Sequence, residues 1–240
     1  MEKKYELTDE TYNHYGKKLY RIRALKNFDD VKAGDLGGFV EKEENLSQHG
    51  RCWIYDDAKV YEDAKVWSDA KIYDFAHIFG KAEIRGYAKV YDNAMILDTV
   101  HVYENAEIRG NVKVFNTVRV YGNAKLDDEV VLDGGIDIRG NSEIKGDIEI
   151  CVDSVSIFGN ALIKSEDDYA FIKGFGRANR ETIFFLGADN IIYVCCGCFE
   201  GSIDEFVKKI KETHKNSYLA KEYLAIVRLM KKRFKRRNRK

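Results

Sequence analysis

Residues 58–90 read AKVYEDAKVWSDAKIYDFAHIFGKAEIRGYAKV, and this stretch decides the fold. An aliphatic residue recurs at every sixth position, from Ile54 before the stretch to Ile150 beyond it, without interruption. A second column, two residues earlier, holds small residues such as Ala58 and Ala64. A short period repeated this many times indicates a solenoid, in which each repeat buries its inner face by stacking on its neighbours.

A six-residue period does not match a helix, whose apolar stripe recurs every 3.6 residues. It fits short strands, because alternate residues of a strand point the same way and both columns then face inward. The strands are separated by residues that tolerate positive φ, such as Asp92-Asn93 and Gly140-Asn141, which tight corners need. Three strands and three corners complete a triangular coil, so the sequence predicts a mostly β protein with a parallel β-helix of about six coils.

The pattern aliphatic-x-x-x-small-x, as in Val60-Tyr61-Glu62-Asp63-Ala64-Lys65, resembles the hexapeptide-repeat proteins. The resemblance covers roughly half of the chain and implies that the β-helix is left-handed. This family includes many acyltransferases, the γ-type carbonic anhydrases and proteins without enzyme activity. The resemblance therefore predicts a fold without deciding a function.

The chain divides into four parts by composition and pattern. We expect an N-terminal cap over 1–51, the β-helix over 52–164, a small α+β module over 165–230 and a basic tail over 231–240. The cap is expected because the open end of a solenoid needs cover. In the α+β module we expect three strands, a helix that begins at the capping box of Ser202 and Glu205, and a second helix that begins at Ser217.

Charge is distributed unevenly along a chain whose formal net charge is zero. The β-helix has 13 Lys and Arg against 20 Asp and Glu, a balance of −7, whereas residues 231–240 hold eight positive charges and no acid. The tail therefore predicts either binding to nucleic acid or another anionic partner, or a role in solubility.

Composition also indicates the compartment. No apolar run approaches the length of a membrane span, and the N-terminus lacks the apolar core of a signal peptide. The five cysteines are odd in number and fit reduced thiols better than a disulfide framework. We therefore expect a cytoplasmic protein that has no membrane partner.

Two further stretches resemble segments of short hexapeptide-repeat proteins encoded by phages and prophages. The first is Gly34-Asp35-Leu36-Gly37-Gly38-Phe39, just before the repeats. The second comprises residues 176–182 and 197–206 with Thr213-His214, and it resembles a C-terminal module of such proteins. The resemblance implies an origin in a phage or prophage of a bacterial host, and it implies no particular activity.

The outward residues sort into three faces, because each face recurs at every eighteenth residue. The residues just after the aliphatic column are Tyr55, Tyr73, Tyr91, Arg109 and Asp127 on the first face, Trp67, Arg85, Tyr103, Tyr121 and Arg139 on the second, and Tyr61, Phe79, Leu97, Phe115 and Asp133 on the third. The third face therefore carries an apolar ladder, and an exposed strip of this length favours an interface. Stacking on a solvated sheet would give the same pattern.

Hexapeptide-repeat proteins commonly form trimers along a solenoid face, so the resemblance implies a homotrimer. The residues expected in its interface are Tyr61, His77, Phe79, Met95, Leu97 and Phe115. His77 is also the candidate for the histidine base that hexapeptide acyltransferases usually place at a subunit boundary. His101, 24 residues later, falls on another face.

Metal-binding patterns are sparse. A carbonic-anhydrase-like zinc site needs three converging histidines, and no third histidine joins His77 and His101. Cys195, Cys196 and Cys198 are close in sequence, but adjacent residues of a strand point to opposite sides. We therefore expect free thiols, and neither a metal nor another cofactor.

The candidate binding site is a glycine-flanked loop of the C-terminal module, and the alternative interpretation is a solvated turn beside helix-packing residues. Its candidate residues are Arg177, Asn179, Arg180 and Thr182, with Cys198 and His214 added from around the first helix. Guanidinium groups beside backbone amides suit a phosphate or carboxylate. The sequence thus predicts a non-enzymatic trimeric scaffold that binds a small anionic ligand, such as a nucleotide, or a host protein, in keeping with a counter-defence role. The alternatives are an acyl-CoA-dependent acyltransferase and a nucleic-acid-binding scaffold that acts through residues 231–240.

Overall fold

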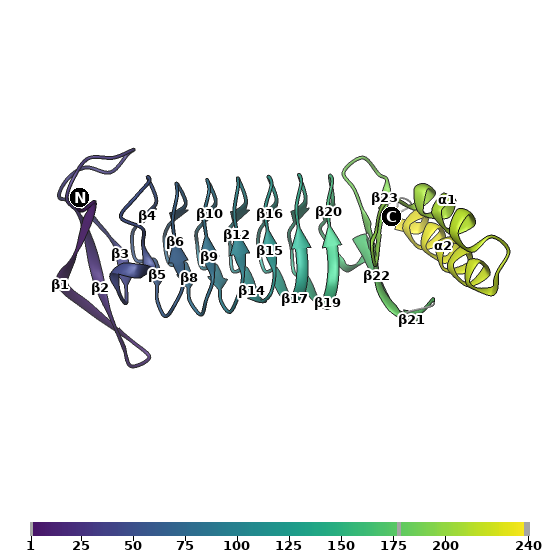
Figure 1. The fold of residues 1–240 in the computed structure, drawn as a ribbon, viewed down its shortest axis with the longest axis horizontal. Helices are drawn as coiled ribbons and strands as arrows, with labels where there is room; N and C mark the ends of the chain where they lie inside the picture. The colour runs from purple at the N-terminus through teal and green to yellow at the C-terminus, as the bar shows by residue number, and fades with distance from the viewer. Residues whose placement is uncertain (1, 177–178, 238–240) are drawn as a thin grey trace.

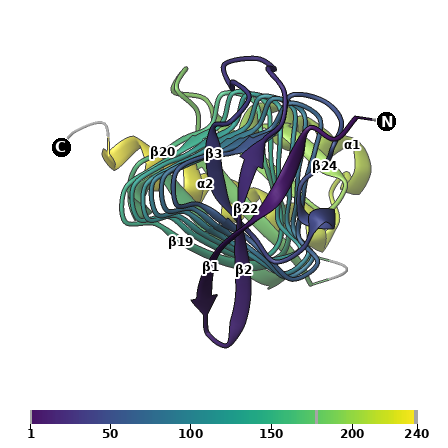
Figure 2. The ribbon, with the colours of Figure 1, turned by 90° about the vertical axis from the view of Figure 1, so that its left-hand side faces the viewer.

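The computed structural model describes residues 2–176 and 179–237 and shows a rod with a helical end (Figure 1). The rod is a parallel β-helix whose coils are triangular in the end-on view (Figure 2). The predicted fold class, a mostly β chain with a β-helix and a small α+β module, is confirmed. One face holds seven stacked strands, so there are seven coils there instead of about six, because the repeat continues to Ile163.

Each coil contributes a short strand to each face. The first face consists of β4 (Trp53–Ile54), β7 (Lys71–Ile72), β10 (Lys89–Val90), β13 (Glu107–Ile108), β16 (Lys125–Leu126), β18 (Glu143–Ile144) and β20 (Leu162–Ile163). The second face contains β6 (Lys65–Val66), β9 (Glu83–Ile84), β12 (His101–Val102) and β15 (Arg119–Val120). The third face contains β5 (Lys59–Val60), β8 (His77–Ile78), β11 (Met95–Ile96) and β14 (Lys113–Asn116). Two longer strands, β17 (Val131–Ile138) and β19 (Glu149–Ile157), pass from the third face to the second.

The coils stack in register and bury both inward columns. Val60 pairs with Ile78, and Ile78 with Ile96, eighteen residues apart each time. The corners adopt positive φ at acidic residues as well as at glycines, as at Asp74 (55°) and Asp92 (58°). The Asp92 amide donates to the Asp74 carboxylate at 3.1 Å, so the corner carboxylate satisfies a backbone N–H of the next coil.

The repeat slips once near its end. β17 and β19 pair in register up to Gly134 opposite Val152 and again from Ile136 opposite Val155, which leaves one extra residue in β19. The sequence shows the same slip, because the inward residues after Ile150 are Val155 and Ile157, one position later than the period of six requires. This slip predicts one extra residue and a bulge, which the structure confirms. The amides of residues 153 and 154 both donate to Oε2 of Glu181, at 3.1 and 3.3 Å, so the C-terminal module holds the bulge.

The N-terminal segment extends the third face. β1 (Tyr5–His14) and β2 (Lys17–Ala24) form an antiparallel hairpin, and β3 (Leu36–Val40) joins β2 to β5, followed by the short η1 (Glu43–Asn45). The hairpin β1–β2 does more than close the end of the rod. Leu19 of β2 packs with Phe39 of β3 against Tyr61, and all three side chains are buried together.

The C-terminal module closes the other end. After η2 (Glu166–Asp168), an antiparallel sheet is formed by β21 (Tyr169–Phe175), β22 (Arg180–Leu186), β23 (Ile192–Cys196) and β24 (Phe199–Ser202). β24 was not predicted. Ile183 and Phe185 pack on the rod, whereas Phe184 and Val194 pack on the two helices, so the sheet is buried on both sides.

The two helices are α1 (Ile203–His214) and α2 (Tyr218–Arg237). The predicted capping box is confirmed, because the Ser202 side chain accepts from the Glu205 amide and the Glu205 carboxylate accepts from the Ser202 amide. α2 continues into residues expected to form a separate basic tail. Over the described residues, neither helix combines the length and apolar character needed to cross a lipid bilayer.

Candidate functional site

A groove of about 420 Å³ lies where the second face of the rod meets the C-terminal module. The rod supplies stacked columns from successive coils, and the module supplies the end wall. The lining residues from the rod are Thr99, His101, Thr117, Arg119, Gly135, Asp137, Asp153, Ser154, Val155 and Ser156, and those from the module are Cys195 and Gly197. A volume of this size suits a small-molecule ligand.

The imidazole of His101 is the ionisable group in this groove best suited to proton transfer. Its Nδ1 lies 3.6 Å from Oε2 of Glu83, one coil earlier in the same column. Both side chains remain more than a third exposed, so the ring is accessible to a ligand. A carboxylate beside one ring nitrogen leaves the other nitrogen for a reacting group.

Arg119 and Asp137 continue this column toward the module. Nε and Nη2 of Arg119 donate to the two carboxylate oxygens of Asp137 at 2.5 and 2.7 Å, and this pairing raises the pKa of Arg119 above its ordinary value. The hydroxyls of Thr99 and Thr117 donate to backbone carbonyls of the next coil at 3.0 and 3.2 Å. Their oxygens therefore remain available as acceptors for a ligand.

Cys195 belongs to the end wall of the groove. It is 4% exposed, and its Sγ accepts from the backbone amide of Ser156 at 3.3 Å, which joins β23 to the bulged strand β19. Burial raises the pKa of this thiol. A neutral, hydrogen-bonded thiol fits a structural contact better than a nucleophile.

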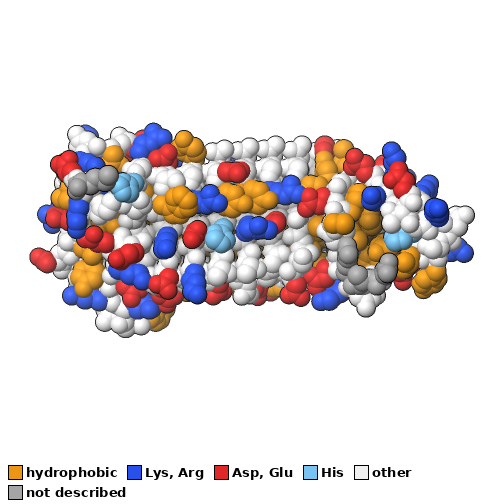
Figure 3. Space-filling model, viewed as in Figure 1, with side chains coloured by type: hydrophobic (Ala, Val, Ile, Leu, Met, Phe, Trp, Pro, Cys, Tyr) orange, Lys and Arg blue, Asp and Glu red, His pale blue; other side chains and the backbone are white. Residues whose placement is uncertain are grey.

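An aromatic and arginine ladder borders the groove along the second face. Arg85 lies between the rings of Trp67 and Tyr103, 5.4 and 4.4 Å from their centroids, and Tyr103 stacks on Tyr121 at 4.8 Å. Figure 3 shows this face, with orange and blue side chains alternating along the rod over β6, β9, β12 and β15. Because the rings stack on one another, the ladder offers a ligand mainly ring edges.

The residues predicted for the trimer interface lie in two different environments. Tyr61 is 6% exposed because the chain's own N-terminal hairpin covers it, and His77 lies 4.9 Å from the ring of His14 in that hairpin. The other predicted interface side chains, further along the same face, remain partly exposed: Phe79, Met95, Leu97 and Phe115. The trimer interface remains a prediction. The part of the apolar ladder on the third face that is open to a partner begins beyond Tyr61.

The residues predicted to bind an anion lie only partly within the described part of the chain. Arg177 lies outside the described residues, and of Arg180 the structure describes only its backbone in β22. Asn179 is exposed in a turn with a φ of 47°. Thr182 is fully buried, and its hydroxyl has no hydrogen-bond partner among the described residues.

The other two residues predicted to bind the ligand, Cys198 and His214, lie in different elements of the C-terminal module. Cys198 is exposed in the turn between β23 and β24. His214 ends α1 and stacks on Tyr223, whose ring also contacts Phe175 beside the glycine-flanked loop. The structure thus connects His214 to that loop through the packing of Tyr223.

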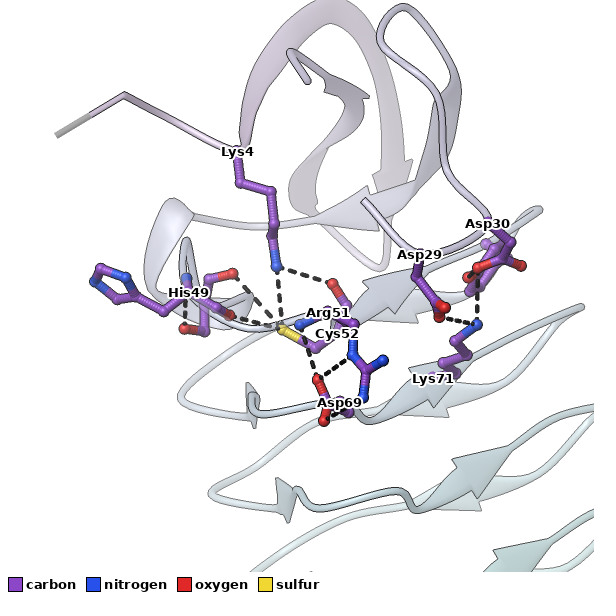
Figure 4. A network of polar contacts seen from close by, with 10 residues as sticks. Lys4, Asp29, Asp30, His49, Arg51, Cys52, Asp69 and Lys71 are labelled. Carbon is purple, nitrogen blue, oxygen red and sulfur yellow. Dashed lines mark hydrogen bonds and ion pairs between the residues drawn. The ribbon is translucent and has the colours of Figure 1, made fainter. Parts of the chain in front are cut away.

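A second polar network lies under the N-terminal segment (Figure 4). The buried Lys4 donates from Nζ to the carbonyl oxygen of Cys52 at 2.9 Å and contacts its Sγ at 3.2 Å. Burial lowers the pKa of Lys4 and raises that of Cys52. Nearby, Lys71 lies between Asp29 and Asp30 at 2.7 and 2.8 Å. These contacts attach the N-terminal segment to the first coils.

Metal ligands are not grouped in the part of the chain that the structure describes, where no three His, Cys, Asp or Glu side chains come together as a metal site would require.

Sequence reasoning missed the groove, although part of its signal was present. Glu83, His101, Arg119 and Asp137 occur at intervals of eighteen residues, so they form one column. The end wall had no such signal, because Cys195 reaches the rod only through tertiary packing.

Comparison with known proteins gives a limited match. No model of a known protein family matches the chain. Over 66 residues, the chain is 39% identical to an uncharacterized acetyltransferase, YdcK, of Escherichia coli K12. The match covers 24% of this chain and 20% of that relative, so the chain spans about a fifth of the relative's length. With the stacked coils, the match supports the hexapeptide-repeat class.

Proposed function

We propose that the protein transfers an acyl group from a thioester donor, such as an acyl-coenzyme A, to an amine or alcohol, with His101 as general base. The observation that carries the proposal is the pairing of His101, which lines the groove at the end of the second face, with Glu83 one coil earlier. The relative described as an acetyltransferase supports the same reaction class. The scaffold prediction lacks an equivalent observation, because Arg177 lies outside the described residues.

The proposed reaction uses His101 twice. The neutral imidazole accepts the proton of the acceptor as its nitrogen or oxygen attacks the thioester carbonyl. The carbon–sulfur bond then breaks, and the imidazolium returns the proton to the leaving thiolate, so the products are the acylated acceptor and a free thiol. Glu83 stabilises the imidazolium that exists between these two steps.

The rest of the groove binds and orients the reactants. Thr99 and Thr117 present oxygen acceptors in line with the rod axis, which suits the amide N–H groups of an extended thioester arm. The ion pair of Arg119 and Asp137 offers both a donor and an acceptor surface beside His101. The wall at Cys195 and Gly197 closes the groove, so the C-terminal module contributes to binding.

Release of free thiol from acetyl-coenzyme A, in the presence of mixed amine and alcohol acceptors, tests the proposal. We expect release above the uncatalysed background, a loss of about 100-fold or more in His101→Asn, and a smaller loss in Glu83→Gln. The matched control is His77→Asn on the third face, which should keep the wild-type rate. Wild-type protein that releases no thiol, or a His101→Asn variant as active as the wild type, would contradict the proposal.

A further inference from the structure

The two C-terminal helices form a basic end on an acidic rod. Residues 203–237 contain 12 Lys and Arg against 4 Asp and Glu, a balance of +8, whereas residues 52–164 contain 13 against 20, a balance of −7. Figure 1 places α1 and α2 together at the end opposite the N-terminal hairpin. Positive charge is therefore concentrated at one end of a long molecule.

α2 separates its apolar and basic residues onto different sides. The buried side consists of Ala220, Tyr223, Val227, Met230 and Phe234. The exposed side carries four cations, which we call the basic stripe: Lys221, Arg228, Lys232 and Lys235. They are seven, four and three positions apart, a spacing that keeps them on one helix face. At 1.5 Å of rise per residue, the stripe is about 21 Å long.

Neighbouring cations are used within the protein, whereas the stripe is not. Lys231 pairs with Asp204, and Arg233 donates to the carbonyl oxygen of Glu166 at 3.0 Å. The acid within α2, Glu222, accepts from the Gly176 amide at 2.8 Å. The four stripe cations form no ion pair with any residue in 2–176 or 179–237. Their charge is thus left for a partner.

We propose that the basic stripe, with the exposed lysines 208, 209 and 211 of α1, binds the phosphate backbone of double-stranded DNA without reading its sequence. A stripe of about 21 Å runs alongside roughly six base pairs, at 3.4 Å for each. Its lysines and arginine suit phosphates, and the stripe contains no Asn or Gln side chain of the kind that reads base edges. The proposal is independent of acyl transfer.

Other anionic surfaces fit this helix less well. Insertion into a lipid surface needs an apolar helix face, but the apolar side of α2 is buried, and its exposed large apolar residues are only Tyr218 and Leu229 within the described part. Binding of single strands relies on aromatic platforms for the bases, and Tyr218 alone offers a ring on this surface. The acidic rod repels phosphates, so DNA binds at the helical end of the molecule.

Fluorescence anisotropy of a labelled 24-base-pair duplex of random sequence, measured with the full chain over a range of salt concentrations, tests this inference. We expect binding at 50 mM salt that weakens steeply as salt rises. The variant with Gln at all four stripe positions (Lys221→Gln, Arg228→Gln, Lys232→Gln and Lys235→Gln) should bind at least tenfold more weakly. Its log–log salt slope should be shallower by about 3 to 4.

The control removes the same charge from the rod, through Lys65→Gln, Lys81→Gln, Lys89→Gln and Lys113→Gln, all of which are exposed. This variant should bind the duplex within twofold of the wild type, and both variants should keep the wild-type melting temperature. Absence of wild-type binding at 50 mM salt, equal losses in the two variants, or tighter binding to phosphatidylserine vesicles than to the duplex would each overturn the inference.

Discussion

The second and third faces of the rod are built from the same repeat but have different surroundings. Tyr61 stacks on Phe79 on the third face with centroids 4.9 Å apart, and Tyr103 stacks on Tyr121 on the second face at 4.8 Å. Tyr61 is nevertheless 6% exposed, because the N-terminal hairpin covers it, whereas Tyr103 remains partly exposed beside the groove. Equivalent positions in the repeat thus have different roles.

The two histidines of the β-helix show what this difference means for function. His77 packs against His14, and burial, with smaller contributions from Lys59 and His14, lowers its pKa to about 4. His101 lies in the groove beside Glu83. The repeat places each histidine on a face, but segments outside the repeat determine whether that face is covered.

The largest effect is expected from a change to the interior that both faces share. Val90 is fully buried in the inward column of β10. Val90→Asp places a carboxylate there without a partner, which should cost about 5 kcal/mol of the free energy of unfolding. Urea unfolding followed by circular dichroism measures this loss, or the variant will be insoluble. A soluble variant with an unchanged midpoint would mean that the inward column is misassigned.

A matched pair of truncations tests the difference in cover between the faces. Tyr61→Ala should lower the free energy of unfolding by about 3 kcal/mol, because it removes a buried ring that packs on Leu19, Phe39 and Phe79. Tyr103→Ala removes an equivalent ring from the open face and should cost about 1 kcal/mol or less. Equal losses in urea unfolding would show that the hairpin does not bury the third face.

The repeat also explains how much of the fold was predictable. A period of six identifies inward positions wherever it persists, and its slip after Ile150 correctly predicted the bulge. The hairpin was harder, because β1 (YELTDETYNH) lacks alternating apolar residues and is stabilised by pairing with β2. Cover on the third face therefore could not be predicted from the repeat.

The candidate site was only half visible in the sequence for the same reason. The column of Glu83, His101, Arg119 and Asp137 follows directly from the spacing of eighteen residues. The groove also needs the wall at Cys195, which meets Ser156 through a contact between segments 39 residues apart. Such a contact between non-repeated segments leaves no periodic trace.

A smaller effect is expected from acidification, and it should arise on the third face. In the unfolded chain His77 titrates near 6.5, whereas in the folded chain its pKa is about 4. As pH falls from 6.5 to 4, the unfolded state takes up a proton that the folded state does not. The free energy of unfolding therefore decreases across this window, and above pH 6.5 this contribution of His77 is fully present. Burial also lowers the pKa of His14, so His14 contributes to the pH dependence in the same direction.

Thermal melts at pH 7.5, 5.5 and 4.5 measure this effect. We expect the wild-type melting temperature to fall by several degrees over this range, and His77→Gln to reduce the fall, since the variant lacks the titrating ring. The difference between the two proteins should be constant above pH 7, where His77 is neutral in both states. A His77→Gln variant with the full wild-type pH dependence would contradict the assignment.

The smallest effect on folding is expected from substitutions in the part of the apolar ladder that the hairpin leaves open. Leu97 and Phe115 are partly exposed and lie beyond Tyr61, so Leu97→Glu with Phe115→Glu should cost about 1 kcal/mol or less within one chain. In a trimer that uses this face, the same carboxylates are buried between subunits and should separate them. Light scattering should then give the 27.7 kDa mass of a single chain in place of a trimer.

The control, Tyr103→Glu with Tyr121→Glu in adjacent coils of the second face, should keep the wild-type mass. A wild-type protein with a mass of 27.7 kDa would contradict the predicted trimer. Dissociation of the control variant alone would show that the interface lies on the second face, which carries His101.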